Sequence, residues 1–282
     1  MKYAFFGTPK FAAIILENLA KAQMAPAIVI CNPDKPVGRK KIVTLPPTKE
    51  VALKYNIEVA QPENLKSWDN EARLKGYEFA VVAAYAKIIP QRILDLFPKG
   101  VIGIHPSFLP KYRGASPIQS AILNGDAKTG VTLYVLDKEV DHGPVIDAET
   151  VPIDEHDNYT SLLGKLAVFG GEMLTHKLPE WYVGKIIPKE QDHGAATFTK
   201  KFGEKDAMVD LAKDNSLEIY RKIKALNPEP GVYTFIQKDD KKLRVKLLEA
   251  LYSDNKLVLK KVQVEGKNPT ENRRYIDELI KV

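Results

Sequence analysis

The sequence predicts an α/β protein: a doubly wound, mostly parallel, Rossmann-like sheet, followed by a small β-rich, OB-like C-terminal domain. Through residues 1–150, short apolar runs alternate with longer amphipathic segments. That alternation is typical of parallel strands joined by helices. Beyond residue 205 the order changes to one helix followed by several strand-like runs, which is typical of a small antiparallel domain.

The first domain is justified element by element from its hydrophobic periodicity. The helix predicted at residues 9–21 places Phe11, Ile14, Ile15 and Leu19 on one face. Further helices are predicted at residues 48–55, 90–97, 115–123 and 157–178. Continuous or alternating apolar runs predict strands at residues 3–6, 27–31, 79–85, 101–105 and 132–137. In such sheets the chemistry gathers where parallel strands end, so the residues after each run are the candidates for a site.

The second domain follows a stretch, residues 181–201, that lacks sustained periodicity and is interpreted as a crossing linker. The predicted boundaries are a catalytic domain at 1–188, a linker at 189–205 and a small, shortened OB-like domain at 206–282. Within the last, a helix is predicted at residues 216–226, a turn at NPEPG, and strands at residues 233–236, 243–251 and 257–264.

Composition narrows the class of protein. Of the 282 residues, 44% are hydrophobic and 28% are charged, which is ordinary globular composition and excludes wholesale disorder. No apolar run reaches the roughly 18 residues of a membrane span, and Gly7 and Pro9 interrupt the first apolar stretch too early for a secretory signal. The single cysteine excludes an internal disulfide and a cysteine-based zinc site. We therefore expect a cytoplasmic monomer with no membrane partner and no metal.

The basic character of the chain has a local source. The net charge is +6, and residues 32–49 carry five basic side chains against one acidic side chain. This segment is long for a connection inside a compact α/β domain, which hints at a function. A basic arm of this kind suits an RNA backbone, although a merely solvated basic loop is an equally good interpretation of the charges alone.

Nucleotide-binding fingerprints are missing from the sequence. The first predicted strand is followed by FFGTPKF, which offers one glycine and then a proline, and no Walker lysine motif occurs. Binding of a nucleotide cofactor through those loops is therefore disfavoured, even though the sheet resembles that of dinucleotide-binding proteins.

Two segments carry residues suited to proton transfer. His105 ends a predicted strand immediately before Pro106, and imidazole is the side chain that exchanges protons near neutral pH. Asp141 lies in a short loop between two apolar runs, where a carboxylate can orient an imidazole. Taken alone, each has a plainer interpretation: His105 as a structural histidine and Asp141-His142-Gly143 as a turn. Cys31 is interpreted as a core residue, and the other histidines show no metal-ligand spacing.

Together these segments resemble the formyltransferases that use 10-formyltetrahydrofolate. The family pattern Asn-x-His-x-Ser-Leu-Leu-Pro, followed by an aromatic-Arg-Gly and later by Asp-x-Gly, is matched closely by residues 105–110, 112–114 and 141–143, with Gly103 at the position of the asparagine. The segments FFGTPKFA, NPDKPVGRKK, VVAAYAKIIP and IKALNPEPGVYTF are similar to methionyl-tRNA formyltransferases. The resemblance covers nearly the whole chain, and its motifs are specific.

The resemblance implies an enzyme that transfers the formyl group of 10-formyltetrahydrofolate, its cosubstrate, to the amino group of initiator methionyl-tRNA. It implies His105 as the proton acceptor, Asp141 as its partner, and Gly103 at the position of the family's asparagine. The implied folate-binding residues are Ala86, Lys87, Ile88, Ile89, Ser107, Phe108, Leu109, Pro110 and Asp141. The implied tRNA-binding residues are Lys35, Arg39, Lys40 and Lys41.

Two departures from the family pattern bear on activity. Gly103 cannot supply the amide that helps to place the formyl group, and losing one such donor typically costs about 10²–10³ in rate, so we expect reduced activity. About one hairpin of the C-terminal barrel is missing. Two alternatives stay open: a sugar-nucleotide N-formyltransferase, and a tRNA-binding protein that has lost catalysis. Glycinamide-ribonucleotide formylation is disfavoured, because those enzymes have no corresponding second domain.

Overall fold

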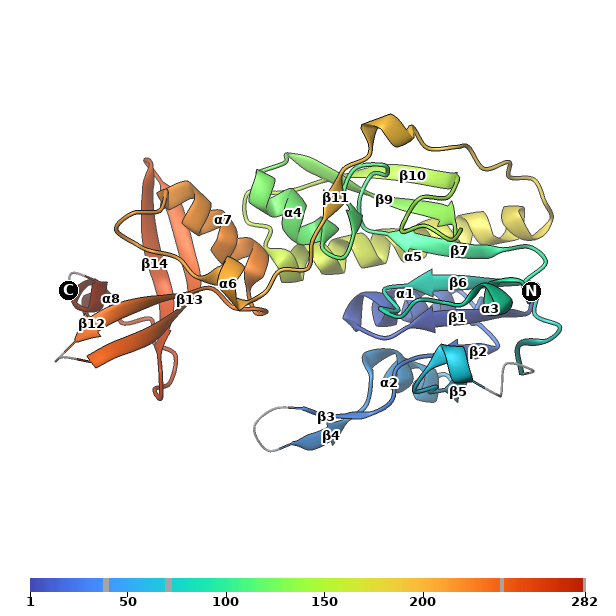
Figure 1. Ribbon diagram of the computed structural model, residues 1–282, viewed down its shortest axis with the longest axis horizontal. Coiled ribbons are helices and arrows are strands. Elements are labelled where there is room, and N and C mark those ends of the chain that lie inside the picture. Colours follow the sequence, from blue (N-terminus) through green and yellow to red (C-terminus); the bar gives the residue numbers. More distant parts are fainter. Residues whose placement is uncertain (38–40, 69–72, 239–240, 281–282) are drawn as a thin grey trace. The chain divides into compact units, whose positions relative to one another are not determined.

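The computed structural model describes residues 1–37, 41–68, 73–238 and 241–280. It contains a seven-stranded sheet in the order β10-β9-β7-β6-β1-β2-β5 (Figure 1). The strands are β1 (Tyr3–Gly7), β2 (Ile28–Ile30), β5 (Glu58–Ala60), β6 (Phe79–Ala83), β7 (Val101–His105), β9 (Lys128–Val135) and β10 (Val145–Pro152). The pairs β5–β2, β2–β1, β1–β6 and β6–β7 are parallel, and β9 joins β7 antiparallel. The predicted mostly parallel sheet is confirmed.

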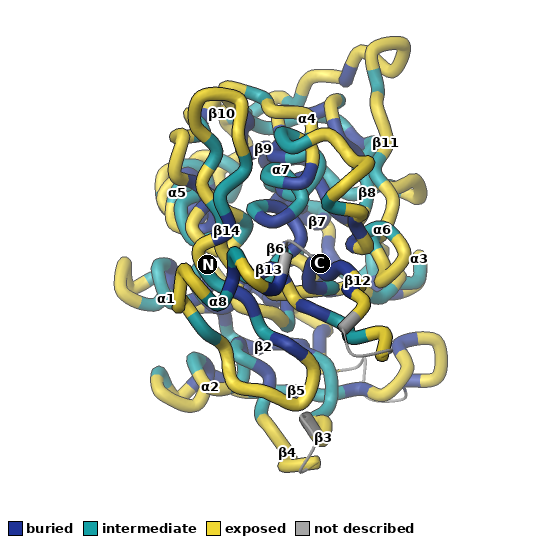
Figure 2. The backbone as a smooth tube through the Cα atoms, turned by 90° about the vertical axis from the view of Figure 1, so that its left-hand side faces the viewer, coloured by how far each residue is buried: buried dark blue, intermediate teal, exposed yellow. Residues whose placement is uncertain are grey.

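Helices cover this sheet because their apolar faces match its buried surface. In α1 (Lys10–Lys21), Phe11, Ile15 and Leu19 are buried, as the periodicity predicts. The long helix α5 (Tyr159–Tyr182) lies on the same face of the sheet, since a Cβ at its Gly170 would stand 3.2 Å from Ile104 Cγ2 of β7 and 4.0 Å from Ile15 Cδ1 of α1. The tube in Figure 2 shows buried residues along the central strands β1, β2, β6 and β7, whereas the edge strands β5 and β10 are largely intermediate or exposed.

Several elements differ from the prediction. The helix predicted at residues 90–97 is only one turn, α3 (Gln91–Leu94), because Pro98 disfavours helical backbone at the residue before it. The expected loop of residues 32–47 contains a short pair of antiparallel strands, β3 (Lys35–Val37) and β4 (Ile42–Thr44). The strands β5 and β10 and the last helix, α8 (Arg273–Ile280), were not predicted. The helix α2 (Pro47–Lys54) lies close to its predicted position.

The chain forms two compact units. The first comprises residues 1–114, 129–151 and 163–198, and the second comprises residues 115–128, 152–162 and 199–282. In the second unit, α4 (Pro117–Asn124) packs on α7 (Ser216–Leu226) beside a three-stranded antiparallel sheet. Its strands are β12 (Tyr233–Lys238), β13 (Lys241–Ser253) and β14 (Lys256–Val264). The boundaries 1–188, 189–205 and 206–282 remain predictions about how the chain folds.

The short elements complete the description. They are the 3₁₀ turns η1 (Leu65–Ser67) and η3 (His193–Ala195), the strands β8 (Arg113–Gly114) and β11 (Phe198–Thr199), and α6 (Glu204–Ala207). Among the described helices, none combines the length and the apolar character that crossing a bilayer requires.

Candidate active site

His105 is the last residue of β7, and its side chain is almost fully buried, with 7% of its surface exposed. Its Nε2 lies 2.8 Å from the carbonyl oxygen of Tyr112. Because a carbonyl oxygen can only accept, Nε2 carries the proton in this contact and Nδ1 is the nitrogen with the free lone pair. Nδ1 faces the carboxylate of Asp141, whose Oδ2 is 3.5 Å away. A proton gained at Nδ1 would therefore place positive charge directly opposite a carboxylate.

The carboxylate of Asp141 is fixed by one donor on each oxygen. The backbone N–H of Gly114 donates to Oδ2 at 2.7 Å, and the hydroxyl of Tyr134 donates to Oδ1 at 2.6 Å. Burial raises the pKa of Tyr134 well above its ordinary value, and the nearby charge of Asp141 adds to that increase. The phenol therefore stays a donor at neutral pH, and the structure brings His105 and Asp141 together as the sequence predicted.

The loop that carries Asp141 is held in an uncommon backbone conformation. Asp141 has a φ of +51°, in the left-handed region that Asp tolerates better than most residues. The side-chain amide of Gln191 donates to the carbonyl oxygens of Asp141 and Gly143, at 3.0 and 2.7 Å. A Cβ on Gly143 would stand 1.9 Å from the carbonyl oxygen of Val135, so only glycine fits there. This close approach accounts for the Asp-x-Gly pattern.

Arg113 supports the same loop through Gln191. Its side chain is buried, and its Nε and Nη2 donate to Gln191 Oε1 at 3.2 and 2.6 Å. Nη2 also lies 2.9 Å from Nδ1 of His193. Arginine and glutamine therefore form a chain of hydrogen bonds that ends on the backbone of residues 141–143.

Gly103 lies in the middle of β7, two residues before His105. It pairs in register with Tyr134 of β9, and side chains opposite one another share a face of the sheet. A Cβ on Gly103 would stand 2.4 Å from the Tyr134 ring and 2.6 Å from Leu136 Cδ1. The ring of Tyr134 thus fills the space into which a side chain at position 103 would project.

The turn of residues 107–110, implied in folate binding, follows β7 and is fastened to β9. The hydroxyl of Thr132 donates to the carbonyl oxygen of Ser107 at 2.7 Å and accepts from the N–H of Leu109 at 3.0 Å. Ser107 Oγ in turn donates to the carbonyl oxygen of Lys111 at 2.5 Å. Ser107 and Leu109 are buried, Pro110 is partly exposed, and Phe108 is 47% exposed. Phe108 is therefore the member of this turn most open to a ligand.

The second implied folate-binding segment, residues 86–89, follows β6. Because β6 and β7 are parallel neighbours, both segments leave the same edge of the sheet. Ala86 is exposed with a φ of +60°, and Ile88 is 85% exposed, whereas Ile89 packs against the core. Lys87 Nζ donates to the carbonyl oxygens of Pro62 and Glu63, and burial lowers the pKa of Lys87. Ala86 and Ile88 are therefore exposed, whereas Ile89 is partly buried, and the role of all three in folate binding stays a prediction.

The basic arm is described only in part. Lys35 and Lys41 are exposed, on β3 and just before β4, whereas Arg39 and Lys40 lie outside the described residues. At the start of the arm, Lys49 Nζ donates to both carboxylate oxygens of Asp34, at 2.9 and 2.7 Å. Gln61 Nε2 donates to Asp34 Oδ1 at 2.7 Å. The bonds from Gln61 and Lys49 lower the pKa of Asp34, so this anchor holds at neutral pH.

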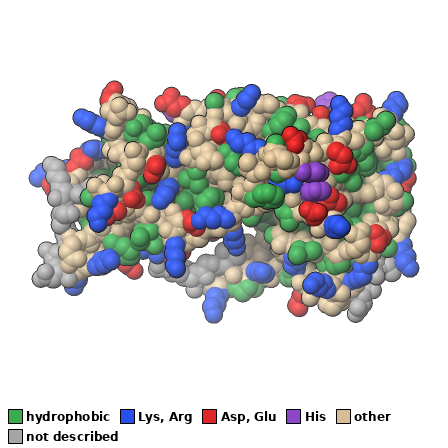
Figure 3. Space-filling model, turned by 45° about the horizontal axis from the view of Figure 1, so that its top comes forward, with side chains coloured by type: hydrophobic (Ala, Val, Ile, Leu, Met, Phe, Trp, Pro, Cys, Tyr) green, Lys and Arg blue, Asp and Glu red, His purple; other side chains and the backbone are tan. Residues whose placement is uncertain are grey.

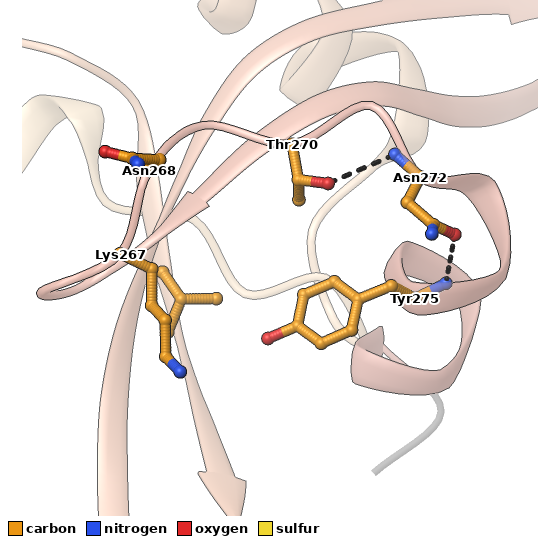
Figure 4. Close-up of a pocket in the computed structure, with 6 residues that line it drawn as sticks. Lys267, Asn268, Thr270, Asn272 and Tyr275 are labelled. Carbon is orange, nitrogen blue, oxygen red and sulfur yellow. Dashed lines mark hydrogen bonds between the residues drawn. The ribbon is translucent and has the colours of Figure 1, made fainter.

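The described residues contain two further features that no motif indicated. The imidazoles of His142 and His193 stack with ring centroids 4.0 Å apart, and His142 Nδ1 is 2.7 Å from Asp137 Oδ2. Figure 3 shows adjacent histidine side chains beside acidic ones on one face of the molecule. Separately, a pocket lies between the end of β14 and α8 (Figure 4), lined by Val264, Lys267, Asn268, Thr270, Asn272 and Tyr275. No residue of the predicted site lines that pocket.

Sequence reasoning gave Arg113 no role, although the aromatic-Arg-Gly motif contains it. It missed Tyr134, Thr132 and Gln191 as parts of the site. Thr132 and Tyr134 belong to an ordinary alternating strand, and Gln191 lies in a stretch interpreted as linker. No local signal marks them, because their roles arise from contacts between segments far apart in the chain. Within the described ranges, no cluster of three or more His, Cys, Asp or Glu side chains could hold a metal ion.

Comparisons with known proteins find similarity over most of the chain. Residues 1–178 match the model of the family described as formyl transferase, and residues 201–257 match that of the formyl transferase C-terminal domain. The methionyl-tRNA formyltransferase of Kosmotoga olearia is 38% identical over 257 residues, covering 90% of this chain and 81% of that protein. The protein of that name from Thermotoga sp. strain RQ2 is 39% identical over 245 residues, covering 86% and 78%.

Solved structures share the fold. The methionyl-tRNA formyltransferase of Clostridium thermocellum aligns with a TM-score of 0.61 at 18% identity, covering 94% of this chain and 99% of that chain. An N-formyltransferase from Helicobacter canadensis, solved with folinic acid and dTDP-3-aminofucose, aligns with a TM-score of 0.63 at 20% identity, covering 90% of this chain and 88% of that chain. From its two family matches and its relatives, this chain belongs to the formyl transferase family.

Proposed function

We propose that this protein transfers the formyl group of 10-formyltetrahydrofolate to the amino group of initiator methionyl-tRNA. The observation that carries the proposal is the buried pair of His105 and Asp141 at the end of β7, with Nδ1 and Oδ2 3.5 Å apart. The relatives with 38–39% identity over most of the chain are methionyl-tRNA formyltransferases, which favours this acceptor over a sugar amine.

The pair suits transfer to an amine. An α-amino group has a pKa of roughly 7.7–8.0, so much of it is protonated at neutral pH, and only the free base can attack the formyl carbon. In our mechanism the free amine attacks the formyl carbon and forms the new carbon–nitrogen bond. His105 takes one proton at Nδ1 from the nitrogen that has attacked, since Nε2 is engaged with the Tyr112 carbonyl oxygen. The carboxylate of Asp141 stabilises the resulting imidazolium. The formyl carbon–nitrogen bond of the folate then breaks, and the proton held on His105 can pass to the departing nitrogen.

The substrate sites follow from the placement of the remaining residues. We place the folate between the segments 86–89 and 107–110, where Ile88 and Phe108 offer exposed apolar surface beside the catalytic pair. We place the tRNA phosphates at Lys35 and Lys41 of the arm, together with Arg39 and Lys40 of the sequence. No step of this mechanism uses a metal.

The test is formylation of methionyl-tRNA with 10-formyltetrahydrofolate, by the protein and by its His105→Gln and Asp141→Asn variants. We expect both variants to lose about 10²–10⁴-fold in kcat, the usual range for a general base. Wild-type turnover that survives both changes would overturn the assignment of this pair. Formylation of an amino-sugar nucleotide but not of methionyl-tRNA would favour the sugar enzyme, and tight tRNA binding without turnover would favour a binding protein.

The tRNA contacts have a separate readout. Each of Lys35→Ala and Lys41→Ala is expected to weaken tRNA binding and to reduce the slope of log affinity against log salt by roughly 0.7–0.9. Lys185→Ala is the matched control, because Lys185 is also exposed but lies outside the arm. Equal effects of all three substitutions would show that the arm contributes only general charge.

A further inference from the structure

Tyr134 and Gly103 form a matched pair across two strands of the sheet. They are register partners on β9 and β7, and the tyrosine ring occupies the space that a Cβ on Gly103 would need, with Cε1 only 2.4 Å from it. Only 6% of Tyr134 is exposed. The ring of Tyr134 therefore occupies the space beside Gly103, and this space is available because residue 103 has no side chain.

This position directs the Tyr134 hydroxyl towards the candidate active site. Gly103 and His105 are two residues apart on β7, so they face the same side of the sheet. From its position opposite Gly103, the hydroxyl of Tyr134 donates to Asp141 Oδ1 at 2.6 Å. A hydrogen bond from a hydroxyl to a carboxylate at this distance is charge-assisted and strongly directional. The other carboxylate oxygen is left facing His105.

We propose that Tyr134 is a positioning residue of this enzyme. Its hydroxyl holds the Asp141 carboxylate against His105 Nδ1, and the lack of a side chain at Gly103 leaves the space that its ring requires. This inference rests on the proposed function of the His105–Asp141 pair. On this account Asp141 depends on Tyr134 in addition to the Gly114 N–H, because the Gly114 N–H donates to Oδ2 whereas the Tyr134 hydroxyl donates to Oδ1. Misplacement of a catalytic group by about 1 Å can cost roughly 10²-fold in rate.

The experiment compares Tyr134→Phe with Tyr3→Phe. Tyr3 is the matched control because it is also buried, at 1% exposed, and its hydroxyl also donates a 2.6 Å bond, to the carbonyl oxygen of Met24 in the same unit. We expect Tyr134→Phe to lower kcat by about 10²-fold with the KM values for folate and tRNA within about twofold of wild type. Tyr3→Phe should match wild type in kcat, with a thermal midpoint lowered about as much as that of Tyr134→Phe.

A second readout does not depend on turnover. In protein labelled with ¹³C at aspartate carboxyls, the Asp141 resonance, identified by its loss in Asp141→Asn, should shift in Tyr134→Phe and stay in place in Tyr3→Phe. An unshifted resonance, or an equal kcat for Tyr134→Phe and wild type, would overturn the positioning role. Failure of the wild type to formylate methionyl-tRNA would instead count against the proposed function, and the resonance would still decide the role of Tyr134.

Discussion

Gly103 is the residue at which one methyl group decides how the site is packed. Its backbone is ordinary strand, so any L-residue could adopt it, but a Cβ would meet the ring of Tyr134 at 2.4 Å and the side chain of Leu136 at 2.6 Å. The sequence predicts that position 103 lacks the amide of the family's asparagine. In the structure, the space for such a side chain is filled by Tyr134, whose hydroxyl donates a hydrogen bond to Asp141.

Gly103→Ala is expected to lower the free energy of unfolding by about 1–3 kcal/mol, because overpacking a close-packed core displaces the ring and its neighbours. Gly164→Ala is the control, since Gly164 lies in α5 with open space where its Cβ would be. That change should be neutral or stabilise the protein by up to about 1 kcal/mol, as alanine favours helix. Urea unfolding measures both, and equal stability of the two variants would contradict the packing argument.

The turn after β7 shows how one element is held by another. Thr132 of β9 accepts from one backbone group of residues 107–110 and donates to another, which ties a candidate ligand-binding turn to the interior of the sheet. The same strand carries Thr129, whose buried hydroxyl has no hydrogen-bond partner among the described residues. The two threonines therefore separate the effect of losing a bonded hydroxyl from that of losing a buried one.

Thr132→Val should lower the free energy of unfolding by about 1–3 kcal/mol, because it leaves a buried N–H and a buried carbonyl without this partner. It should also raise the KM for the folate cosubstrate, since the turn loses its attachment. Thr129→Val should be neutral or stabilising, because valine has nearly the same shape and removes an unsatisfied hydroxyl. Urea unfolding and steady-state kinetics check both, and a larger loss of stability in the Thr129 variant would contradict the role of Thr132 in holding the turn.

At the scale of the whole molecule, the division into units differs from the order of the chain. The helix α4 precedes β9 in sequence but belongs to the second unit, where its buried Ile118 and Ile122 lie on the helix that packs against α7. The close fit is visible at Gly125, where a Cβ would stand 2.1 Å from Arg221 Nη2. Cutting the chain near residue 205 thus removes the partner of α4.

A fragment of residues 1–205 should therefore melt at a lower temperature than the full chain and bind a hydrophobic dye, because the apolar face of α4 becomes exposed. Circular dichroism and dye fluorescence measure these effects. A fragment that melts with the full chain's midpoint and binds no dye would instead support the predicted boundary of an independently folding domain at 1–188.

Buried acids make the stability of the molecule sensitive to alkali. Burial raises the pKa of the Cys31 thiol to about 11, against about 8.5 in an unfolded chain. The folded state keeps its proton while the unfolded state loses it, so stability is fully present below about pH 8.5 and declines as pH rises towards 11. Burial raises the pKa values of Tyr3, Tyr85 and Tyr134 as well, which extends the decline above pH 10.

The free energy of unfolding should accordingly fall between pH 9 and 11, with Cys31 contributing up to about 1.4 kcal/mol per pH unit. Cys31→Ala should be less stable at pH 8, because it leaves a cavity, but its stability should decline less steeply with pH. Urea unfolding at intervals of one pH unit measures the slopes. Parallel curves for the two proteins would contradict a proton held by Cys31.

The sequence by itself determined the fold class, the main strands and helices, and the pair of His105 and Asp141. Those features are recorded locally: hydrophobic periodicity lies within a window of a few turns, and strand ends mark where polar groups emerge. The edge strands β5 and β10 and the one-turn helix α3 were missed or misjudged, because their extent depends on pairing and on Pro98 rather than on periodicity.

Only the tertiary structure decided how the pair is supported. Gln191 reaches the carbonyl oxygen of Asp141 from 50 residues away, and Tyr134 meets Gly103 and Asp141 only because β9 lies beside β7 in antiparallel register. Such contacts leave no local pattern, since strand order and register are set by the competition among all possible pairings for burial of the same core. The sequence thus specified the two groups to which we assign the chemistry, and the packing of the sheet determined what holds them in place.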